Sequence, residues 1–117
     1  MAVYVSDESL IAYDCTPPRQ FVGANAYRKD YEDIFAHYVG PIHAELIDFK
    51  IHAEGNLGYG IGLFHVVGTS KEGKTDDLTM RVTDVFRKIN GKWLIVHEHA
   101  SFPVDVATGK ADLTSKP

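Results

Sequence analysis

The residues best suited to chemistry lie in the stretch 76–103, which reads DDLTMRVTDVFRKINGKWLIVHEHASFP. Asp84 stands in the apolar sequence VTDVF, and an aspartate among apolar strand residues must be paired, hydrogen-bonded or protonated. The arginines three positions before and after it cannot pair with it along one strand, because odd and even positions face opposite ways. We therefore expect Asp84 to lie in a pocket.

Two histidines and a glutamate follow on the next predicted strand. His97 and His99 share one face of that strand, and Glu98 lies on the other. Both faces are mostly apolar, so periodicity leaves two arrangements open. If the even positions face inward, the histidines lie at an interface and the cavity is lined by Asp84, Phe86, Val96 and Glu98. With the opposite parity, a different set lies inside: Arg81, Thr83, His97 and His99.

Histidines two residues apart on a strand can share a metal ion, and His65 could supply a third ligand. Nothing else in the chain has ligand spacing, so hydrogen-bonded structural histidines are favoured, and we expect no metal or organic cofactor. His65 stands in the apolar sequence LFHVV, where a core histidine and a ligand contact are both open. Tyr59 shares its face of the strand.

The composition restricts the classes of function. With 117 residues the chain predicts a single domain, and a net charge of −4 without a basic run argues against nucleic acid as a partner. No apolar run is long enough to cross a bilayer, and no signal peptide begins at Met1, so we expect a cytoplasmic protein. The one cysteine, Cys15, has no neighbouring cation to stabilise a thiolate and is not expected to be a nucleophile.

The acidic residues and histidines must be positioned by a long hairpin. Asn90-Gly91 is the dipeptide best able to take positive φ at both central positions, which a type I′ turn requires. The runs TMRVTDVF and WLIVHEHASF on either side are rich in β-branched and aromatic residues and predict strands. Pro103, which cannot donate to a ladder, ends the second strand.

One helix is predicted over residues 24–38. Its apolar residues are spaced i, i+4, i+7, i+8 and i+11, which is one face of an α-helix: Tyr27, Tyr31, Ile34, Phe35 and Tyr38. Charged residues cover the other face: Arg28, Lys29, Asp30, Glu32 and Asp33. Gly40-Pro41 is expected to end the helix.

The remaining strands are predicted at residues 10–14, 44–54 and 57–69. The last of these has three internal glycines, which indicate curvature or a close backbone approach. The polar run SKEGKTDD predicts a solvated hairpin turn. Residues 104–117 are polar and predict a loosely held tail, so the domain is expected to span residues 1–103.

The predicted order is a short strand, a helix and then four long antiparallel strands in a meander. One helix covers only part of the apolar face of such a sheet, so another helix or a second subunit must cover the rest. We expect a homodimer. Its interface would include Trp93 and Ile95 if their face points outward.

In this order and in three motifs, the chain resembles the SnoaL-like and ketosteroid-isomerase-like superfamily, whose cone-shaped fold is shared with nuclear transport factors. The matching stretches are YVSDESLIAYD, then Gly23 followed by a helix with Tyr27 and Tyr31, and NGKWLIVHEHASFP. The resemblance implies an α+β fold. A curved antiparallel sheet of four long strands plus a short first strand wraps around a helix and forms a cone with an internal pocket.

The resemblance also implies site residues. In ketosteroid isomerases, an aspartate nine residues before the helix-opening glycine moves a proton between two carbons, and Asp14 stands at that distance from Gly23. A second aspartic acid, in a V-x-D strand, stays protonated and donates to an enolate oxygen, and Asp84 matches its place. Tyr31 matches a pocket tyrosine. From the residues alone, Asp14 could equally cap the Pro-Pro loop that follows it.

The last motif is also similar to the closing hairpin of the association domain of calcium/calmodulin-dependent kinase, which is an oligomerisation module. His65 matches a pocket arginine of that domain. The chain departs from the ketosteroid isomerases at its start, because their N-terminal helix, with the tyrosine that donates to the enolate, has no counterpart here. That departure disfavours steroid isomerisation.

Two classes of function follow. In the first, the protein is a small isomerase or lyase that binds an apolar carbonyl-bearing molecule, with Asp14 as general base and neutral Asp84 stabilising the oxyanion. The residues expected to bind this substrate are Tyr31, Tyr59, His65, Phe86 and Glu98. In the second, the protein is a non-catalytic module that binds a small ligand or makes a dimer.

Overall fold

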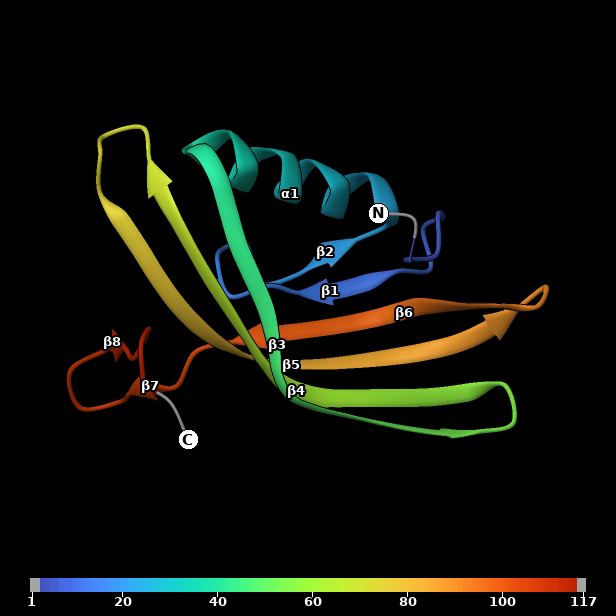
Figure 1. The fold of residues 1–117 in the computed structure, drawn as a ribbon. Helices are drawn as coiled ribbons and strands as arrows, with labels where there is room; N and C mark the ends of the chain where they lie inside the picture. The colour runs from blue at the N-terminus through green and yellow to red at the C-terminus, as the bar shows by residue number, and fades with distance from the viewer. Residues whose placement is uncertain (1–2, 116–117) are drawn as a thin grey trace.

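One strongly bent sheet and one helix build most of the fold in this computed structural model, which describes residues 3–115 (Figure 1). The elements are β1 (Ile11–Tyr13), β2 (Phe21–Val22), α1 (Ala24–His37), β3 (Tyr38–Glu54), β4 (Leu57–Ser70), β5 (Thr75–Ile89), β6 (Lys92–Ser101), β7 (Val104–Asp105) and β8 (Lys110–Ala111). None of the helices in this described part is long and apolar enough to cross a membrane.

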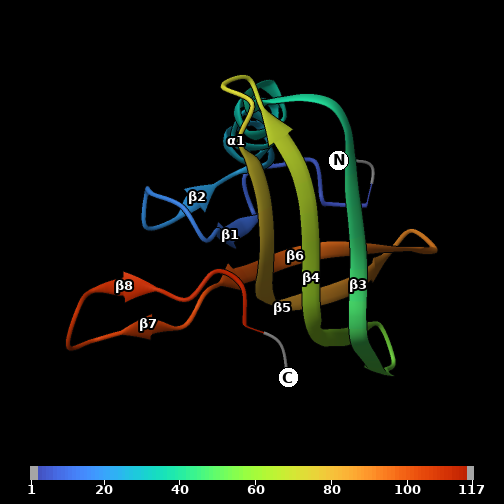
Figure 2. The same ribbon diagram turned by 60° about the vertical axis from the view of Figure 1, so that its left-hand side comes forward.

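The six-stranded sheet has the order β2-β1-β6-β5-β4-β3. Strands β3 to β6 form the predicted antiparallel meander, whereas β1 pairs in parallel with β6. The long strands bend near their middle, and α1 lies on the concave side of the bend (Figures 1 and 2). The predicted α+β fold is therefore confirmed, as a curved sheet around a helix rather than a closed barrel.

The turn between β5 and β6 has the predicted geometry. Asn90 has φ 52° and Gly91 has φ 79°, so both central residues adopt the positive φ of a type I′ turn. Ile89 then pairs directly with Lys92. This tight turn sets the register as far as the pair of Phe86 and Ile95. The register then shifts by one residue, so that Val85 lies opposite His97 and Asp84 lies opposite Glu98.

The helix passes directly into β3, which begins six residues before the predicted start at residue 44. Gly40 has φ 70°, and the pairing of β3 with β4 shifts register between Val39 and His43. Pro41 therefore lies in an irregular part of the strand, where its missing N–H removes no regular ladder bond. The chain bends there without leaving the sheet.

Two glycines of β4 allow a close approach of Phe49. A Cβ at Gly60 or Gly62 would overlap the Phe49 ring, and at Gly62 it would also meet the Phe49 backbone. The Phe86 ring also lies close to the position that a Cβ at Gly60 would take. The glycine-rich sequence of β4 thus permits the aromatic packing on the concave face, as its composition indicated.

The core lies between the first half of α1 and the strands β1 and β6. Its buried apolar members are Val5, Leu10, Ala12, Ala24 and Tyr27. Residues 3–5 extend the sheet, because Val5 N donates to Ile95 O and Ile95 N donates to Val3 O. Ile95 is only 7% exposed, so the outward-facing role considered for it is wrong. The register shift between β5 and β6 places it opposite Phe86, and directly paired residues share a face of the sheet. Trp93 remains 42% exposed.

The described part of the C-terminal segment is not a loose tail. Strands β7 and β8 form a small hairpin whose turn is held by Asp105: its carbonyl accepts from Gly109 N at 2.7 Å and its carboxylate accepts from Ala107 N at 3.0 Å. Beyond it, Thr79 N donates to Leu113 O at 2.8 Å, which ties the segment to β5. The predicted domain boundary after residue 103 stays a prediction.

Candidate functional site

The strand register decides which residues face the helix. Asp84 lies opposite Glu98, which in turn lies opposite Ala12 of the core, so these two acidic residues point toward α1. Closer to the turn the register is shifted, and Phe86 lies opposite Ile95. Asp84 and Glu98 therefore lie on the helix side of the sheet, as in the first of the two arrangements left open by the sequence, whereas the cavity and the interface of that arrangement stay predictions. His97 and His99 lie on the outer face, where the Tyr13 ring packs edge-on against both, with ring centroids 5.0 and 5.4 Å apart.

Glu98 accepts hydrogen bonds from three tyrosines at a single oxygen. Its Oε1 lies 2.6 Å from the Tyr27 hydroxyl, 2.8 Å from that of Tyr4 and 3.2 Å from that of Tyr31. Glu98 is 7% exposed. Three donated hydrogen bonds supply the compensation that a buried carboxylate requires. The tyrosines come from α1 and from the N-terminal segment, so this contact joins the helix, the chain start and β6.

The tyrosines act as donors because they stay protonated. Burial, followed by the charge of Glu98, raises the pKa of Tyr31 to about 12. The same two causes raise the pKa of Tyr4 and of Tyr27 well above the usual range. At physiological pH all three hydroxyls are therefore protonated and can donate hydrogen bonds to Glu98.

Asp84 is a protonated acid beside this carboxylate. It is 7% exposed, and burial raises its pKa to about 9, with further contributions from its hydrogen bond to Glu98 and from the charge of Glu98. Its Oδ1 is buried and has no hydrogen-bond partner within residues 3–115. The structure thus holds a neutral carboxylic acid on the concave face of the sheet, with one oxygen unused.

A second pair of carboxyl groups lies at the end of β1. Asp14 accepts the Cys15 N–H at its Oδ1 at 2.7 Å, so it does cap the loop that follows it. On α1, burial and then the neighbouring Asp14 raise the pKa of Asp30 to about 7, and Asp30 Oδ2 is buried without a hydrogen-bond partner in the described residues. The Asp30 carboxyl group can therefore take up and release a proton near neutral pH.

Asp30 was assigned to the polar face of the helix, and that assignment is wrong. Position 30 lies three residues after Tyr27, which is the most buried tyrosine of α1, and one before Tyr31. Residues three apart lie on the same side of a helix, so the spacing itself carried the signal. Tyr4 was missed for a different reason: its contacts with Tyr31 and Glu98 are 27 and 94 residues distant in sequence.

Asp14 also lines a cleft of about 390 Å³ at the rim of the sheet. The cleft lies between the end of β1, the loop that precedes β2, the end of β6 and the β7–β8 hairpin. Cys15 is among its residues, and burial raises the pKa of this thiol to about 12, with Asp14 adding to the shift. The thiol is thus protonated at neutral pH and is a poor nucleophile, in keeping with the absence of a nearby cation in the sequence.

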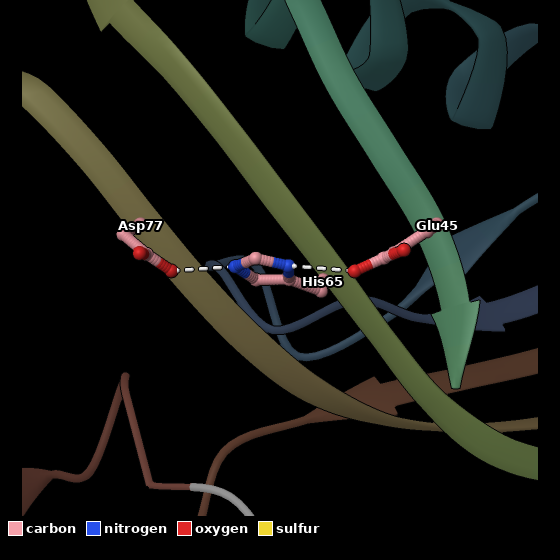
Figure 3. Close-up of polar contacts among 3 residues, drawn as sticks. All are labelled: Glu45, His65 and Asp77. Atoms are coloured by element: carbon pink, nitrogen blue, oxygen red, sulfur yellow. Dashed lines mark hydrogen bonds and ion pairs between the residues drawn. The ribbon is translucent and has the colours of Figure 1, made fainter. Parts of the chain in front are cut away.

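His65 and Tyr59 do not join the concave site. Gly60 lies opposite Asp84 and Tyr59 lies opposite Val85, so the odd positions of β4 face outward. The His65 ring lies between two carboxylates, with Nδ1 3.2 Å from Glu45 Oε1 and Nε2 2.7 Å from Asp77 Oδ1 (Figure 3). The expectation that these two residues share a pocket with Asp84 is not met.

The histidines of the outer face are likewise held separately. His97 Nδ1 donates to Ile11 O at 2.6 Å, while His65 bridges β3 and β5. No group of three or more histidine, cysteine, aspartate or glutamate residues within 3–115 is arranged to hold a metal ion. The residues that the structure does bring to the side of the helix are Asp14, Asp84, Phe86, Glu98 and Tyr31.

The comparisons with known proteins agree with this architecture. Residues 1–105 match the model of the SnoaL-like domain. An NTF2-like protein of unknown function from Pseudomonas putida is 32% identical over 99% of this chain and 79% of its own, with a TM-score of 0.85. The chain therefore belongs to the SnoaL-like family, within the NTF2-like fold. No curated protein matches the sequence.

Two further structures show the same fold at lower identity. A ketosteroid isomerase-like protein from Erwinia carotovora atroseptica is 17% identical over 86% of this chain and 75% of its own, with a TM-score of 0.68. The association domain of CaMKII from C. elegans is 17% identical over 83% of this chain and 74% of its own, with a TM-score of 0.61. The fold is thus similar to proteins with quite different roles, and function must be argued from the site.

Proposed function

We propose that this protein binds a small, apolar, carbonyl-bearing molecule on the concave face of the sheet and moves a proton on it. The observation that carries the proposal is Asp84, a buried acid that keeps its proton at neutral pH and leaves Oδ1 without a partner. A group of this kind is costly in a purely structural role, because a buried polar atom without a hydrogen-bond partner destabilises the fold.

In this proposal the single proton of Asp84, which is shared in a hydrogen bond with Glu98, moves to the partnerless Oδ1 and is donated to the carbonyl oxygen of the bound molecule, while Glu98 keeps its three tyrosine donors. That bond strengthens as the oxygen gains negative charge in the transition state, which is the contribution that accelerates a proton transfer. Phe86 offers an apolar contact next to Asp84 on the same face. Tyr59 and His65 lie on the outer face and have no part in it.

Asp14 is the general base of the proposal. It takes a proton from the carbon next to the carbonyl, and the electron pair of that C–H bond moves to form the enolate, whose oxygen Asp84 stabilises. Returning the proton to the same or another carbon restores a neutral product. Asp30, whose pKa is about 7, supports the exchange of this proton with solvent near neutral pH. Isomerisation, dehydration, aldol-type cyclisation and hydrolysis are all open to such a site.

Exchange of α-hydrogens with D2O tests the proposal without knowledge of the natural substrate. We expect the protein to catalyse exchange in at least one member of a panel of enolisable ketones, aldehydes and 2-oxo acids, followed by proton NMR. Asp14→Asn removes the base and should slow this exchange by roughly 10²- to 10⁴-fold. Asp33→Asn, at an exposed acid paired with Lys29, should exchange at the wild-type rate.

The two variants must both remain folded, which circular dichroism checks. Exchange by Asp14→Asn at the wild-type rate would show that Asp14 is not the base. A lack of exchange across the whole panel would favour the second candidate, in which the concave face binds a molecule without reacting with it or serves only the fold.

A homodimer is proposed on either reading, through the outer face of the sheet. Leu57, Tyr59 and Ile61 of β4 are 53%, 43% and 52% exposed, and a groove of about 900 Å³ lined by Ile61, Leu63 and Arg81 runs over this face. Exposed apolar residues gathered on one sheet face are typical of a surface that a second copy covers. The similarity to an association domain supports self-association only at the level of the fold.

Ile61→Glu tests this interface. Placing a charge on the proposed apolar contact should convert the dimer into a monomer at micromolar concentration, measured by sedimentation velocity. Val106→Glu makes the same change at a residue that is 92% exposed in the turn between β7 and β8, and this variant should stay dimeric. A wild-type protein that sediments as a monomer at micromolar concentration contradicts the dimer.

A further inference from the structure

The cleft at the rim of the sheet has the size and composition of a small-molecule site. Its volume of about 390 Å³ lies at the lower end of the range of roughly 300–1,000 Å³ that is usual for ligand pockets. Its apolar wall is formed by Tyr13, Ala100, Phe102, Val104 and Ala111. Aromatic and aliphatic walls with few polar groups are typical of sites that hold the carbon skeleton of a small ligand.

The β7–β8 hairpin completes this cleft, which gives the C-terminal segment a role. Val104 of β7 and Ala111 of β8 contribute to the lining, opposite residues of β1 and β6. The hairpin is fixed on both sides, because Asp112 N donates to Pro103 O and Thr79 N donates to Leu113 O, each at 2.8 Å. The cleft is therefore bounded by a wall that is held in place.

Arg19 is the permanently charged cation of the cleft. No carboxylate within residues 3–115 forms an ion pair with it, and no described side chain accepts a hydrogen bond from it. Its planar guanidinium can therefore offer two parallel N–H groups to a ligand, the geometry that matches a carboxylate. His99 and Ser101 add further polar groups to the lining.

The charge of the other cleft residues limits the charge of the ligand. The Cys15 thiol is neutral, whereas Asp14 brings negative charge to the same cleft. A ligand with two negative charges would be repelled by Asp14, while a single carboxylate is balanced by Arg19. The lining thus favours a monoanion over a doubly charged anion such as hydrogen phosphate.

We propose that this cleft binds a small organic monocarboxylic acid, with Arg19 as the contact for its carboxylate and Tyr13 and Phe102 against its carbon skeleton. Since Asp14 lines the same cleft, the acid group would belong to the molecule on which Asp14 acts. That last link rests on the proposed function, whereas binding of a carboxylate does not.

Benzoate is a suitable probe, because it has the carboxylate and an aromatic skeleton but no exchangeable α-hydrogen. Titrating the full ¹⁵N-labelled chain with benzoate should shift the amide signals of Cys15, Ser101 and Val104 with saturation below about 50 mM. Arg19→Gln should weaken this binding roughly tenfold, because a charge-assisted hydrogen bond is lost. Benzamide, which has the same shape without the charge, should bind wild type roughly tenfold more weakly than benzoate does.

Arg28→Gln provides the matched control. Arg28 is an exposed arginine of α1 that does not line the cleft, so this variant should bind benzoate like the wild type. The proposal is overturned by an absence of saturable shifts, by equal binding of benzoate to Arg19→Gln and wild type, or by equal binding of benzamide and benzoate. Displacement of benzoate by equimolar inorganic phosphate would also overturn it, since the site would then accept any oxyanion.

These outcomes are independent of the exchange experiment. Benzoate binding that depends on Arg19, together with an absence of α-hydrogen exchange, would leave a carboxylate-binding protein without the proposed chemistry. Exchange that depends on Asp14, without any benzoate binding, would leave the proposed chemistry and remove the carboxylate as the recognised group.

Discussion

At pH 8, Asp84→Asn should be more stable than the wild-type protein, although it removes an acidic side chain from a buried site. The pKa of Asp84 is raised to about 9 in the folded state, whereas an unfolded chain has the ordinary aspartate value of 3.8. Between these two pH values the folded protein holds a proton that the unfolded chain has released. The stability that is present below about pH 4 is therefore lost as the pH rises toward 9.

The expected loss is about 1.4 kcal/mol per pH unit, which gives up to about 4 kcal/mol between pH 5 and pH 8. Asparagine is neutral at every pH, so the variant should lack this part of the slope. Guanidinium unfolding at pH 5, 6, 7 and 8, at one protein concentration, measures the free energy of unfolding of both proteins. The difference between them should grow with pH in favour of Asp84→Asn.

Asp33→Asn is the control for a general effect of removing an acid, because Asp33 is exposed and paired with Lys29. Its pH dependence should follow that of the wild type. Parallel curves for Asp84→Asn and wild type between pH 5 and 8 would mean that Asp84 is already ionised at pH 5. The proposed function would then lose its hydrogen-bond donor.

Glu98→Ala should destabilise the protein by about 3–5 kcal/mol, which is the range for breaking a buried charged network by removing one partner. The substitution leaves the hydroxyls of Tyr4, Tyr27 and Tyr31 without their shared acceptor. Since small domains are stable by only about 5–15 kcal/mol, the variant should approach the limit of folding at 37 °C. Urea unfolding at pH 7 measures the loss.

Glu98→Gln separates the loss of charge from the loss of the acceptor. Glutamine keeps the volume and one acceptor oxygen, so it should cost only about 1–3 kcal/mol. Glu54→Ala, at an exposed side chain of β3, should stay within about 0.5 kcal/mol of the wild type. A Glu98→Ala protein that unfolds within 1 kcal/mol of wild type, by the same measure, would show that the tyrosine hydroxyls find other partners.

The local signals of the sequence were sufficient for most of the fold. The Asn90-Gly91 turn, the helix and the meander follow from dihedral preferences and from the spacing of apolar residues, which act over a few positions. The turn between β4 and β5 is shorter than the run SKEGKTDD predicts, because β4 extends to Ser70 and β5 begins at Thr75. Polar residues can extend a hairpin whose strands are already paired, and composition does not show where pairing stops.

The site was only partly accessible to the same reasoning. The apolar surroundings of Asp84 in sequence indicated a buried acid, and its pKa of about 9 agrees with that indication. The parity of β6 could not be chosen, because both of its faces carry apolar residues. It is fixed by contacts with Tyr27 and Tyr4, which are distant in sequence. His65 and Tyr59 were assigned by resemblance, whereas the register of β4 against β5 decides their face.

Strand β3 is an edge strand of the six-stranded sheet, and this position affects how copies of the molecule can associate. A long strand at the end of a sheet can template the addition of another chain, which leads to aggregation. Along β3 the regular pairing is interrupted between Val39 and His43 and again between Ile47 and Lys50, and Pro41 lies in the first interruption. These breaks divide seventeen residues of border into shorter lengths that are poorly matched to an incoming strand. The irregularities of β3 thus hinder edge-to-edge pairing with further copies of the chain, which would otherwise extend the sheet without limit.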